Sequence, residues 1–384
     1  MFFFFHFGTL AICLYIFFRL FFSIPLHGSI KLAVGGVFLL ISQQHFFFRR
    51  FFGGMASPDL PMPVLAFLGW LFGSLLILFL LLFIHDLVKG MLWVFRFGFP
   101  HARLPFPDWK RVTGLCIMAL AIGAYGIWQG IRVPDIRIQD VFLPRLPKAL
   151  NGLKVVQLTD LHISDLLTRP RAEAIVRKTN AMNPDLILLT GDIVDGPVSR
   201  RKNDVVPLTR LKARYGIFSC LGNHEYYSGL SQWRPVFKKM DLNLLANAHT
   251  VLTINGESLV VAGITDPVAR RSGQPQPDIR AALSGAPDGA FTLVMAHQPK
   301  TARDTADAGA DLQLSGHTHG GHVIGLGPLI KRANDGFSRG WYTIGSMKLY
   351  VSPGAGLWPG FAVRIGVPAE ITCLVLHSGS KDHA

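Results

Sequence analysis

The sequence predicts an N-terminal α-helical transmembrane bundle of about four spans, followed by an α/β (α+β) sandwich domain. Of the 29 phenylalanines, 23 lie in residues 1–110, which leaves 29 − 23 = 6 for the other 274. Only 16% of the residues are charged, compared with about 25% in a soluble domain. After Ile131 the long apolar runs give way to short ones broken by Gly, Pro, Asn and Asp. We therefore assign residues 1–131 to the transmembrane region and 132–384 to the second domain.

Four apolar segments predict the membrane spans. They are residues 1–24, 32–48, 60–84 and 112–131, and about 20 residues suffice to cross a bilayer. Polar residues dilute the end of the second segment. Arg19 lies near the end of the first, where it could face the helix bundle or, as we expect, reach toward the lipid headgroups. A cleavable signal peptide is not expected, because no basic region precedes the first span and further spans follow it.

The positive charges of the short loops predict the orientation. One side holds six of them, Lys31, Lys89, Arg96, Arg103, Lys110 and Arg111, and the other holds Arg49 and Arg50. Four more at the start of the C-terminal domain, Arg132, Arg137, Arg145 and Lys148, would make the sides equal, but charges that lead into a long domain count for less. Lys and Arg accumulate on the cytoplasmic side. The sequence therefore predicts a multi-pass protein of the cell (inner) membrane, with its C-terminal domain on the extracytoplasmic side.

Short apolar runs in the second domain predict its strands. They cover residues 153–158, 186–190, 216–221, 259–264, 291–296, 311–314, 349–352 and 371–376. Residues 171–182 are expected to form a helix, and Trp233, Val236, Phe237 and Met240 have the spacing of one helix face. Strands that first alternate with helices and then follow one another indicate a layered sandwich.

Polar side chains follow these predicted strands. Asp160 and His162 come after the first strand, and Asp192 and Asp195 after the second. The later strands are followed by Asn223, His224 and Glu225, by His297, and by His317 and His319. Groups at the carboxyl ends of adjacent strands converge on one crevice. Oxygen and imidazole donors without thiolates suit Mn²⁺, Fe or Zn²⁺, and the four cysteines have no paired spacing.

The order of these motifs, D-x-H, G-D-x-x-D, G-N-H-E, H and G-H-x-H, resembles that of the calcineurin-like metallophosphoesterase superfamily. The further motifs Ser352-Pro353-Gly354 and Arg364-Ile365-Gly366 resemble its bacterial membrane-associated branch. The resemblance covers about residues 150–376 and implies a metallophosphoesterase sandwich domain. The membrane half is not covered by these motifs.

The resemblance also implies the roles of the site residues. Asp160, His162 and His319 would hold one metal ion, Asn223, His297 and His317 a second, and Asp192 would bridge them. Mn²⁺ is the expected metal, with Zn²⁺ or Fe as alternatives. His224 would protonate the leaving alkoxide, and Asp195 would orient it. Glu225 is expected to be structural, and His249, His322 and Asp165 lie outside the pattern.

The sequence therefore predicts an integral membrane, metal-dependent phosphoesterase. Water activated by a dinuclear metal centre would hydrolyse a phosphodiester, which we favour, or a phosphomonoester, and a lipid is one candidate substrate. The alternative is a membrane sensor or scaffold that binds a phosphorylated ligand without turnover. A transporter is disfavoured because the spans show no paired charges. No clustered basic face with a binding motif supports a nucleic-acid partner, and the sequence leaves the oligomeric state open.

A Gly/Pro-rich loop after residues 349–352 suggests how a lipid would bind. It carries Leu357, Trp358 and Phe361, followed by Arg364. We hypothesise that the three apolar side chains contact acyl chains or the bilayer surface, because Trp favours membrane interfaces. Arg364 would then hold a non-reacting phosphate through its guanidinium. The alternative is that the loop packs back onto its own domain.

Overall fold

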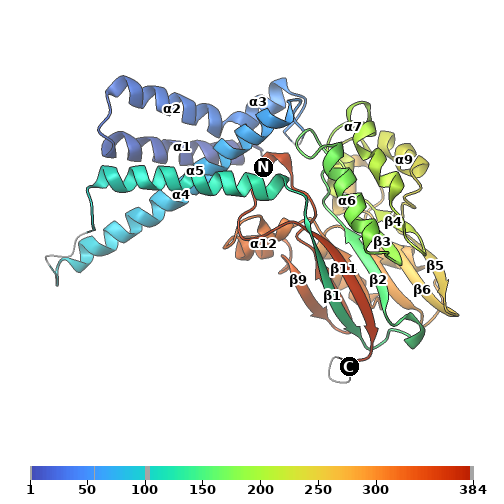
Figure 1. The fold of residues 1–384 in the computed structure, drawn as a ribbon. Coiled ribbons are helices and arrows are strands. Elements are labelled where there is room, and N and C mark those ends of the chain that lie inside the picture. Colours follow the sequence, from blue (N-terminus) through green and yellow to red (C-terminus); the bar gives the residue numbers. More distant parts are fainter. Residues whose placement is uncertain (1, 56, 100–103, 381–384) are drawn as a thin grey trace. The chain divides into compact units, whose positions relative to one another are not determined.

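The computed structural model describes residues 2–55, 57–99 and 104–380 (Figure 1). It divides into two compact units, of which the first is Met1–Gln129 with Pro359–Val363 and the second is Gly130–Trp358 with Arg364–Ala384. The main boundary lies close to the one expected from the sequence. The assignment of Pro359–Val363 to the first unit was not expected. Met1 and Arg103, which entered the predicted first span and the charge count, lie outside the described residues.

The first unit is built from apolar helices. They are α1 (Phe2–Ser23), α2 (Gly28–Ser42), α3 (Gln44–Phe51), α4 (Met62–Phe95) and α5 (Asp108–Ile131). In the described residues, α1, α4 and α5 are long and apolar enough to cross a membrane, and a fourth span results if α2 and α3 count as one. These two helices meet at 54°, at the polar residues that dilute the second predicted span. The prediction of about four spans agrees with this range.

Arg19 does not reach away from the helices as the sequence analysis expected. Its side chain is only 15% exposed, and its Nε and Nη1 lie 2.9 and 3.0 Å from carboxylate oxygens of Asp86 and Asp108. Lys89 and Arg111 contact the same Asp108 carboxylate at 3.1 and 2.9 Å. Pairing offsets the cost of placing a charge among apolar helices. The expectation that the spans show no paired charges is therefore wrong. Helices α4 and α5 extend beyond the predicted spans and include Asp86 and Asp108.

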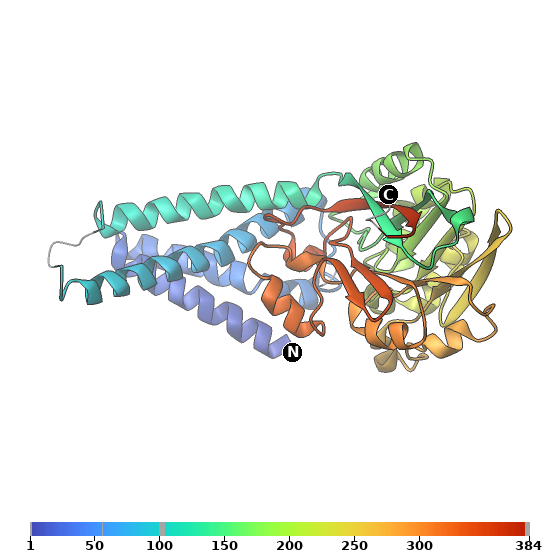
Figure 2. The ribbon, with the colours of Figure 1, turned by 90° about the horizontal axis from the view of Figure 1, so that it is seen from below.

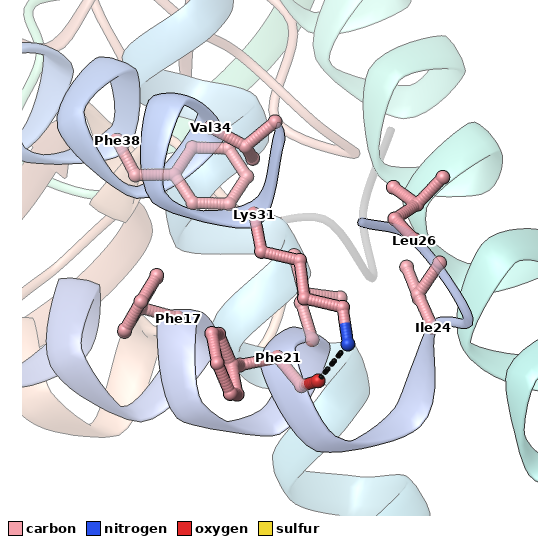
Figure 3. Close-up of a pocket in the computed structure, with 8 residues that line it drawn as sticks. Phe17, Phe21, Ile24, Leu26, Lys31, Val34 and Phe38 are labelled. Atoms are coloured by element: carbon pink, nitrogen blue, oxygen red, sulfur yellow. Dashed lines mark hydrogen bonds between the residues drawn. The ribbon is translucent and has the colours of Figure 1, made fainter. Parts of the chain in front are cut away.

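A small apolar pocket between α1 and α2 shows how these helices are joined (Figure 3). Lys31 Nζ donates a hydrogen bond of 2.7 Å to the backbone carbonyl of Phe21 and lies 4.9 Å from the centre of the Phe21 ring. The last carbonyls of a helix have no partner within it. Lys31 therefore caps the end of α1 from the neighbouring helix.

The second unit contains two sheets (Figures 1 and 2). The order of the first is β1-β11-β2-β3-β4, and that of the second is β5-β6-β7-β8-β10-β9. The strands are β1 (Asp135–Leu143), β2 (Leu153–Leu158), β3 (Leu186–Thr190), β4 (Ile217–Cys220), β5 (Ala248–Ile254), β6 (Glu257–Gly263), β7 (Phe291–Met295), β8 (Leu312–Ser315), β9 (Gly340–Ile344), β10 (Met347–Val351) and β11 (Glu370–Ser378). The runs β2-β3-β4 and β6-β7-β8-β10 are parallel.

Alternating side chains build the layers. In β2, Leu153 and Val155 belong to the core between the sheets, whereas Val156 and Leu158 pack with helices on the outer face, as the two-residue period of a strand requires. The helices of that face include α6 (Arg169–Ala181) and α9 (Leu230–Lys239), and Figure 1 shows them beside β2–β4. The second sheet packs outward against α10 (Ile279–Leu283) and α11 (Ala302–Asp307). The predicted α/β sandwich is confirmed.

Candidate metal centre

The predicted metal ligands lie on turns that follow parallel strands. Asp160 follows β2, Asp192 follows β3, and Asn223 opens the short helix α8 (Asn223–Tyr227) after β4. From the second sheet, His297 follows β7, and His317 and His319 follow β8. Because parallel strands end at the same edge of a sheet, the turns of both sheets meet there. The structure thus brings together side chains that are up to 159 residues apart in sequence (319 − 160).

Backbone strain marks these turns. Five predicted ligands have positive φ angles, namely Asp160 at 52°, His162 at 44°, Asp192 at 53°, His317 at 70° and His319 at 47°. This region is disfavoured for residues with a side chain, and such strain gathers at functional sites. A Cβ atom at Gly222 would lie 2.2 Å from Asp192 Oδ1. Glycine is therefore required where the turn after β4 approaches Asp192.

The first ligand group consists of Asp160, His162 and His319. One ligand atom from each lies within 4.8 Å of the others. His162 Nε2 is 3.1 Å from His319 Nε2, and His319 Nε2 is 3.4 Å from Asp160 Oδ1. All three side chains are buried. Two imidazoles and a carboxylate that converge on one buried point form a chemically suitable site for a divalent transition metal.

The second group consists of Asp192, His297 and His317. His297 Nε2 lies 3.0 Å from Asp192 Oδ2, while His297 Nδ1 donates to the Thr190 carbonyl at 2.9 Å. A backbone carbonyl on one ring nitrogen orients the other toward a metal. Asn223 Oδ1 is buried and forms a hydrogen bond to no described residue, so it offers the additional oxygen that the sequence analysis expected.

Asp192 lies within reach of both groups. Its Oδ2 is 3.0 Å from His297 Nε2 and 3.7 Å from His162 Nε2. The residues present therefore fit two divalent metal ions with one shared carboxylate. The seven ligands predicted from the sequence lie at this site. His224 also has a ring nitrogen within 4.8 Å of ligand atoms of His162 and Asp192.

Asp195 holds two imidazoles at once. Its Oδ1 is 2.5 Å from His224 Nδ1, and its Oδ2 is 2.9 Å from His162 Nδ1. Burial opposes the charged imidazole of His224, but Asp195 and then Asp192 outweigh it and raise the pKa of His224 to about 9. The two carboxylates thus favour the protonated form of His224. The second contact of Asp195, to the ligand His162, was not predicted.

Glu225 connects the turns of two strands. Its carboxylate accepts hydrogen bonds from the backbone N–H groups of Asp192, Ile193, Val194 and Gly222, at 2.7–3.3 Å. The side chain is completely buried. This geometry agrees with the structural role expected for Glu225.

Arg364 has surroundings that differ from the expected phosphate site. It is completely buried, and its Nη2 donates to the carbonyls of Pro353 and Gly356 at 2.7 and 2.5 Å. The same nitrogen lies 3.1 Å from His319 Nδ1. Its guanidinium is therefore engaged by this chain and supports a metal ligand. A sequence motif does not show such backbone partners.

The apolar residues of the same loop lie in different environments. Leu357 is completely buried, and Phe361 packs in the apolar cluster of the first unit. Trp358 is half-buried, with its ring centre 6.5 Å from that of His224. Tyr227, which the sequence analysis missed, is 57% exposed and lies 5.4 Å from His224, centre to centre. Its position three residues after His224 on a helix is the signal that would have revealed it.

The residues placed outside the pattern stay outside both ligand groups. His249 Nδ1 hydrogen-bonds to the Ala282 carbonyl at 2.7 Å, and Asp165 pairs with Arg201 at 2.5 Å. The His322 ring stacks on His319 with a centre distance of 4.5 Å.

This fold and this donor set fit a metal-dependent hydrolase. A family model described as calcineurin-like phosphoesterase matches residues 153–321. An uncharacterized metallophosphoesterase of Helicobacter pylori strain J99 is 33% identical over 279 residues, which cover 72% of this chain and 73% of that protein. The chain belongs to the calcineurin-like metallophosphoesterase family, which uses a dinuclear divalent metal centre.

Two further relatives match a longer stretch of the chain than the family model does. The metallophosphoesterase YkuE of Bacillus subtilis is 31% identical and aligns with 61% of this chain and 82% of its own length. A Danio rerio protein described as a transmembrane protein with metallophosphoesterase domain is 29% identical over 368 residues, 85% of this chain and 84% of that protein. Together with the apolar helices, this relative indicates membrane association.

The shared position of Asp192 yields a prediction about metal content. Asp192→Asn removes the carboxylate that lies within reach of both ligand groups. We expect purified protein to fall from roughly two metal ions per chain to one or fewer, measured by mass spectrometry of metals after dialysis. Asp165→Asn, which changes a neighbouring carboxylate outside the ligand groups, should keep its metal. An Asp192→Asn protein that still held two metal ions per chain would show that Asp192 does not bridge them.

Proposed function

We propose that this protein is a membrane-associated, metal-dependent phosphoesterase that hydrolyses a phosphodiester in preference to a phosphomonoester. The observation that carries the proposal is the His224–Asp195 pair beside two ligand groups, with Asp192 in one of them and 3.7 Å from His162 of the other. Ligands alone would suit a binding protein. A protonated imidazole held by a buried carboxylate next to them is what bond cleavage needs in addition.

The metal ions would be held by Asp160, His162 and His319 on one side and by Asn223, His297 and His317 on the other, with Asp192 between. When bound, such a pair of ions clamps the phosphate and lowers the pKa of an attacking water. We propose Mn²⁺ as the native metal, with Zn²⁺ or Fe as alternatives, because imidazole and carboxylate ligands suit all three.

His224 would supply the proton for the departing group. As water attacks phosphorus and releases one proton to solvent, the bond from phosphorus to the leaving oxygen breaks. His224 transfers its proton to that oxygen and is afterwards reprotonated from solvent. The Asp195 carboxylate holds the imidazole and stabilises its positive charge until the transfer. The products are an alcohol and a phosphate with one ester bond fewer.

The aromatic residues beside His224 support a diester with an apolar organic group. Tyr227 and Trp358 both present rings to His224, at 5.4 and 6.5 Å between centres. We propose a phospholipid as the substrate class, since apolar helices accompany the site in one chain. The charges of the short loops support placing the domain on the extracytoplasmic side of the inner membrane.

The role of His224 can be separated from metal binding. His224→Ala should retain its metal and lose about 10²- to 10⁴-fold in kcat on a chromogenic phosphodiester, the usual share of general acid–base catalysis. His249→Ala should leave both quantities unchanged. A loss of metal in parallel with the rate would make His224 a ligand. A metal-loaded wild-type protein that hydrolyses no phosphoester would favour the sensor or scaffold.

Trp358 gives the test of the lipid substrate. Trp358→Ser should lower activity on a micellar phospholipid by roughly tenfold, because about 1.4 kcal/mol of apolar contact would be lost. Activity on a small soluble phosphodiester should survive. Trp341→Ser, at a residue that hydrogen-bonds to Gln139, is the control for a tryptophan elsewhere. Equal losses on both substrates would remove the support for a lipid.

A further inference from the structure

The loop between β10 and β11 contributes to both units. Its residues Pro359–Val363 belong to the first unit, whereas the residues on either side, Trp358 and Arg364, belong to the second. The chain therefore enters the helical unit for only five residues and leaves again. A single linker at the end of α5 would already suffice to anchor the second unit. The additional crossing needs another explanation.

Specific contacts hold this segment in the first unit. His45 of α3 is completely buried, and its Nε2 lies 2.7 Å from the Gly360 carbonyl oxygen. The His45 ring packs edge-on against Phe72 and Phe48, with centre distances of 4.7 and 5.7 Å. A buried donor that lost its acceptor would be costly. His45 therefore fixes the backbone of the segment and not only its apolar surface.

A glycine of α4 gives the segment its space. A Cβ atom at Gly73 would lie 2.6 Å from Val363 Cγ1, which is closer than real Cβ contacts allow. Farther along the same helix, a Cβ atom at Gly90 would meet nothing within 4 Å. Phe361 packs in the same apolar cluster as Phe72 and Leu75. Gly73 thus lets Val363 approach the helix backbone, and Gly90 is a matched position without that contact.

The two ends of the segment lead directly to the metal centre. Trp358, one peptide bond before it, faces His224, and Arg364, one peptide bond after it, contacts His319 Nδ1 at 3.1 Å. Within the second unit, the buried Arg171 also holds the loop. Its guanidinium donates to the carbonyl of Ile131, the last residue of α5, at 3.2 Å, and to the carbonyl of Ala355 in the loop.

We propose that the helical unit positions the metal centre, with His45 and Gly73 as positioning residues that act through Pro359–Val363 on His319 and Trp358. The proposal rests on the proposed function and deepens it. The helices would then help to set the activity of the metal centre, in addition to anchoring the second unit. A displacement of the segment would move Arg364 and so disturb its contact with His319. Misplacement of a catalytic group by about 1 Å is enough to slow an enzyme markedly.

A cross-link tests the position of the segment without any activity. An ideal Cβ at position 73 lies 3.6 Å from the Val363 Cβ, within the span of a disulfide. Full-length protein with Gly73→Cys and Val363→Cys should form this disulfide on mild oxidation, identified by peptide mass spectrometry. Gly90→Cys with Val363→Cys should not. Failure of the first pair to cross-link would overturn the proposal.

The functional arm compares matched variants of the full chain. Gly73→Val and His45→Phe should raise the Mn²⁺ concentration for half-maximal metal uptake and lower kcat on a soluble phosphodiester, each by roughly 5- to 50-fold. KM for this soluble substrate should stay within about twofold, since its hydrolysis does not depend on Trp358. Gly90→Val should match the wild type. His45→Gln, which keeps a donor for the Gly360 carbonyl, should recover most of the loss.

The outcomes separate this proposal from the proposed function. If Gly73→Val binds Mn²⁺ and turns over substrate like Gly90→Val, the helices do not position the centre and the proposal is wrong. If the wild type hydrolyses no phosphoester, the proposed function fails. The cross-link and the Mn²⁺ titration still decide whether the helical unit positions His319.

Discussion

The fold of the second unit depends on placing three carboxylates out of water at one point. Asp160, Asp192 and Asp195 are at most 2% exposed, and buried carboxylates are stable only when they are paired or bind metal. Asp195 is paired by hydrogen bonds with His162 and His224. Asp160 and Asp192 repel each other, and burial together with Asp192 holds the pKa of Asp160 above its ordinary value. Bound divalent cations would offset this repulsion, and the strained turns hold the ligands in place for them.

The sequence predicted what local patterns encode. The apolar runs at β2 and β3 and the polar residues after them sufficed to predict the strands and the ligands, because a buried strand leaves a continuous signature and its end is marked by the turn. Strand β1 was missed because polar residues alternate through it and most of its side chains are exposed. The pairing of Arg19 with Asp86 and Asp108 was missed for a different reason. It joins three helices, and the apolar segments contain only one of the three residues.

The loop between β10 and β11 shows where pattern-based interpretation ends. Leu357, Trp358, Phe361 and Arg364 are close in sequence, and composition suggested one shared role at a lipid surface. The structure gives them four different environments: a core, the neighbourhood of His224, the helical unit, and the support of His319. Tertiary contacts decide between these environments, and no local propensity records them. The sequence motifs therefore predicted where the site lies, but they could not predict the role of each residue around it.

The central claim is that two divalent metal ions share Asp192. Its most direct test is an anomalous diffraction map of Mn²⁺-loaded crystals of the detergent-purified protein. We predict two anomalous peaks, one ligated by Asp160, His162 and His319 and the other by Asn223, His297 and His317, with Asp192 bound to both. A single peak, or two peaks of which only one contacts Asp192, would contradict the account.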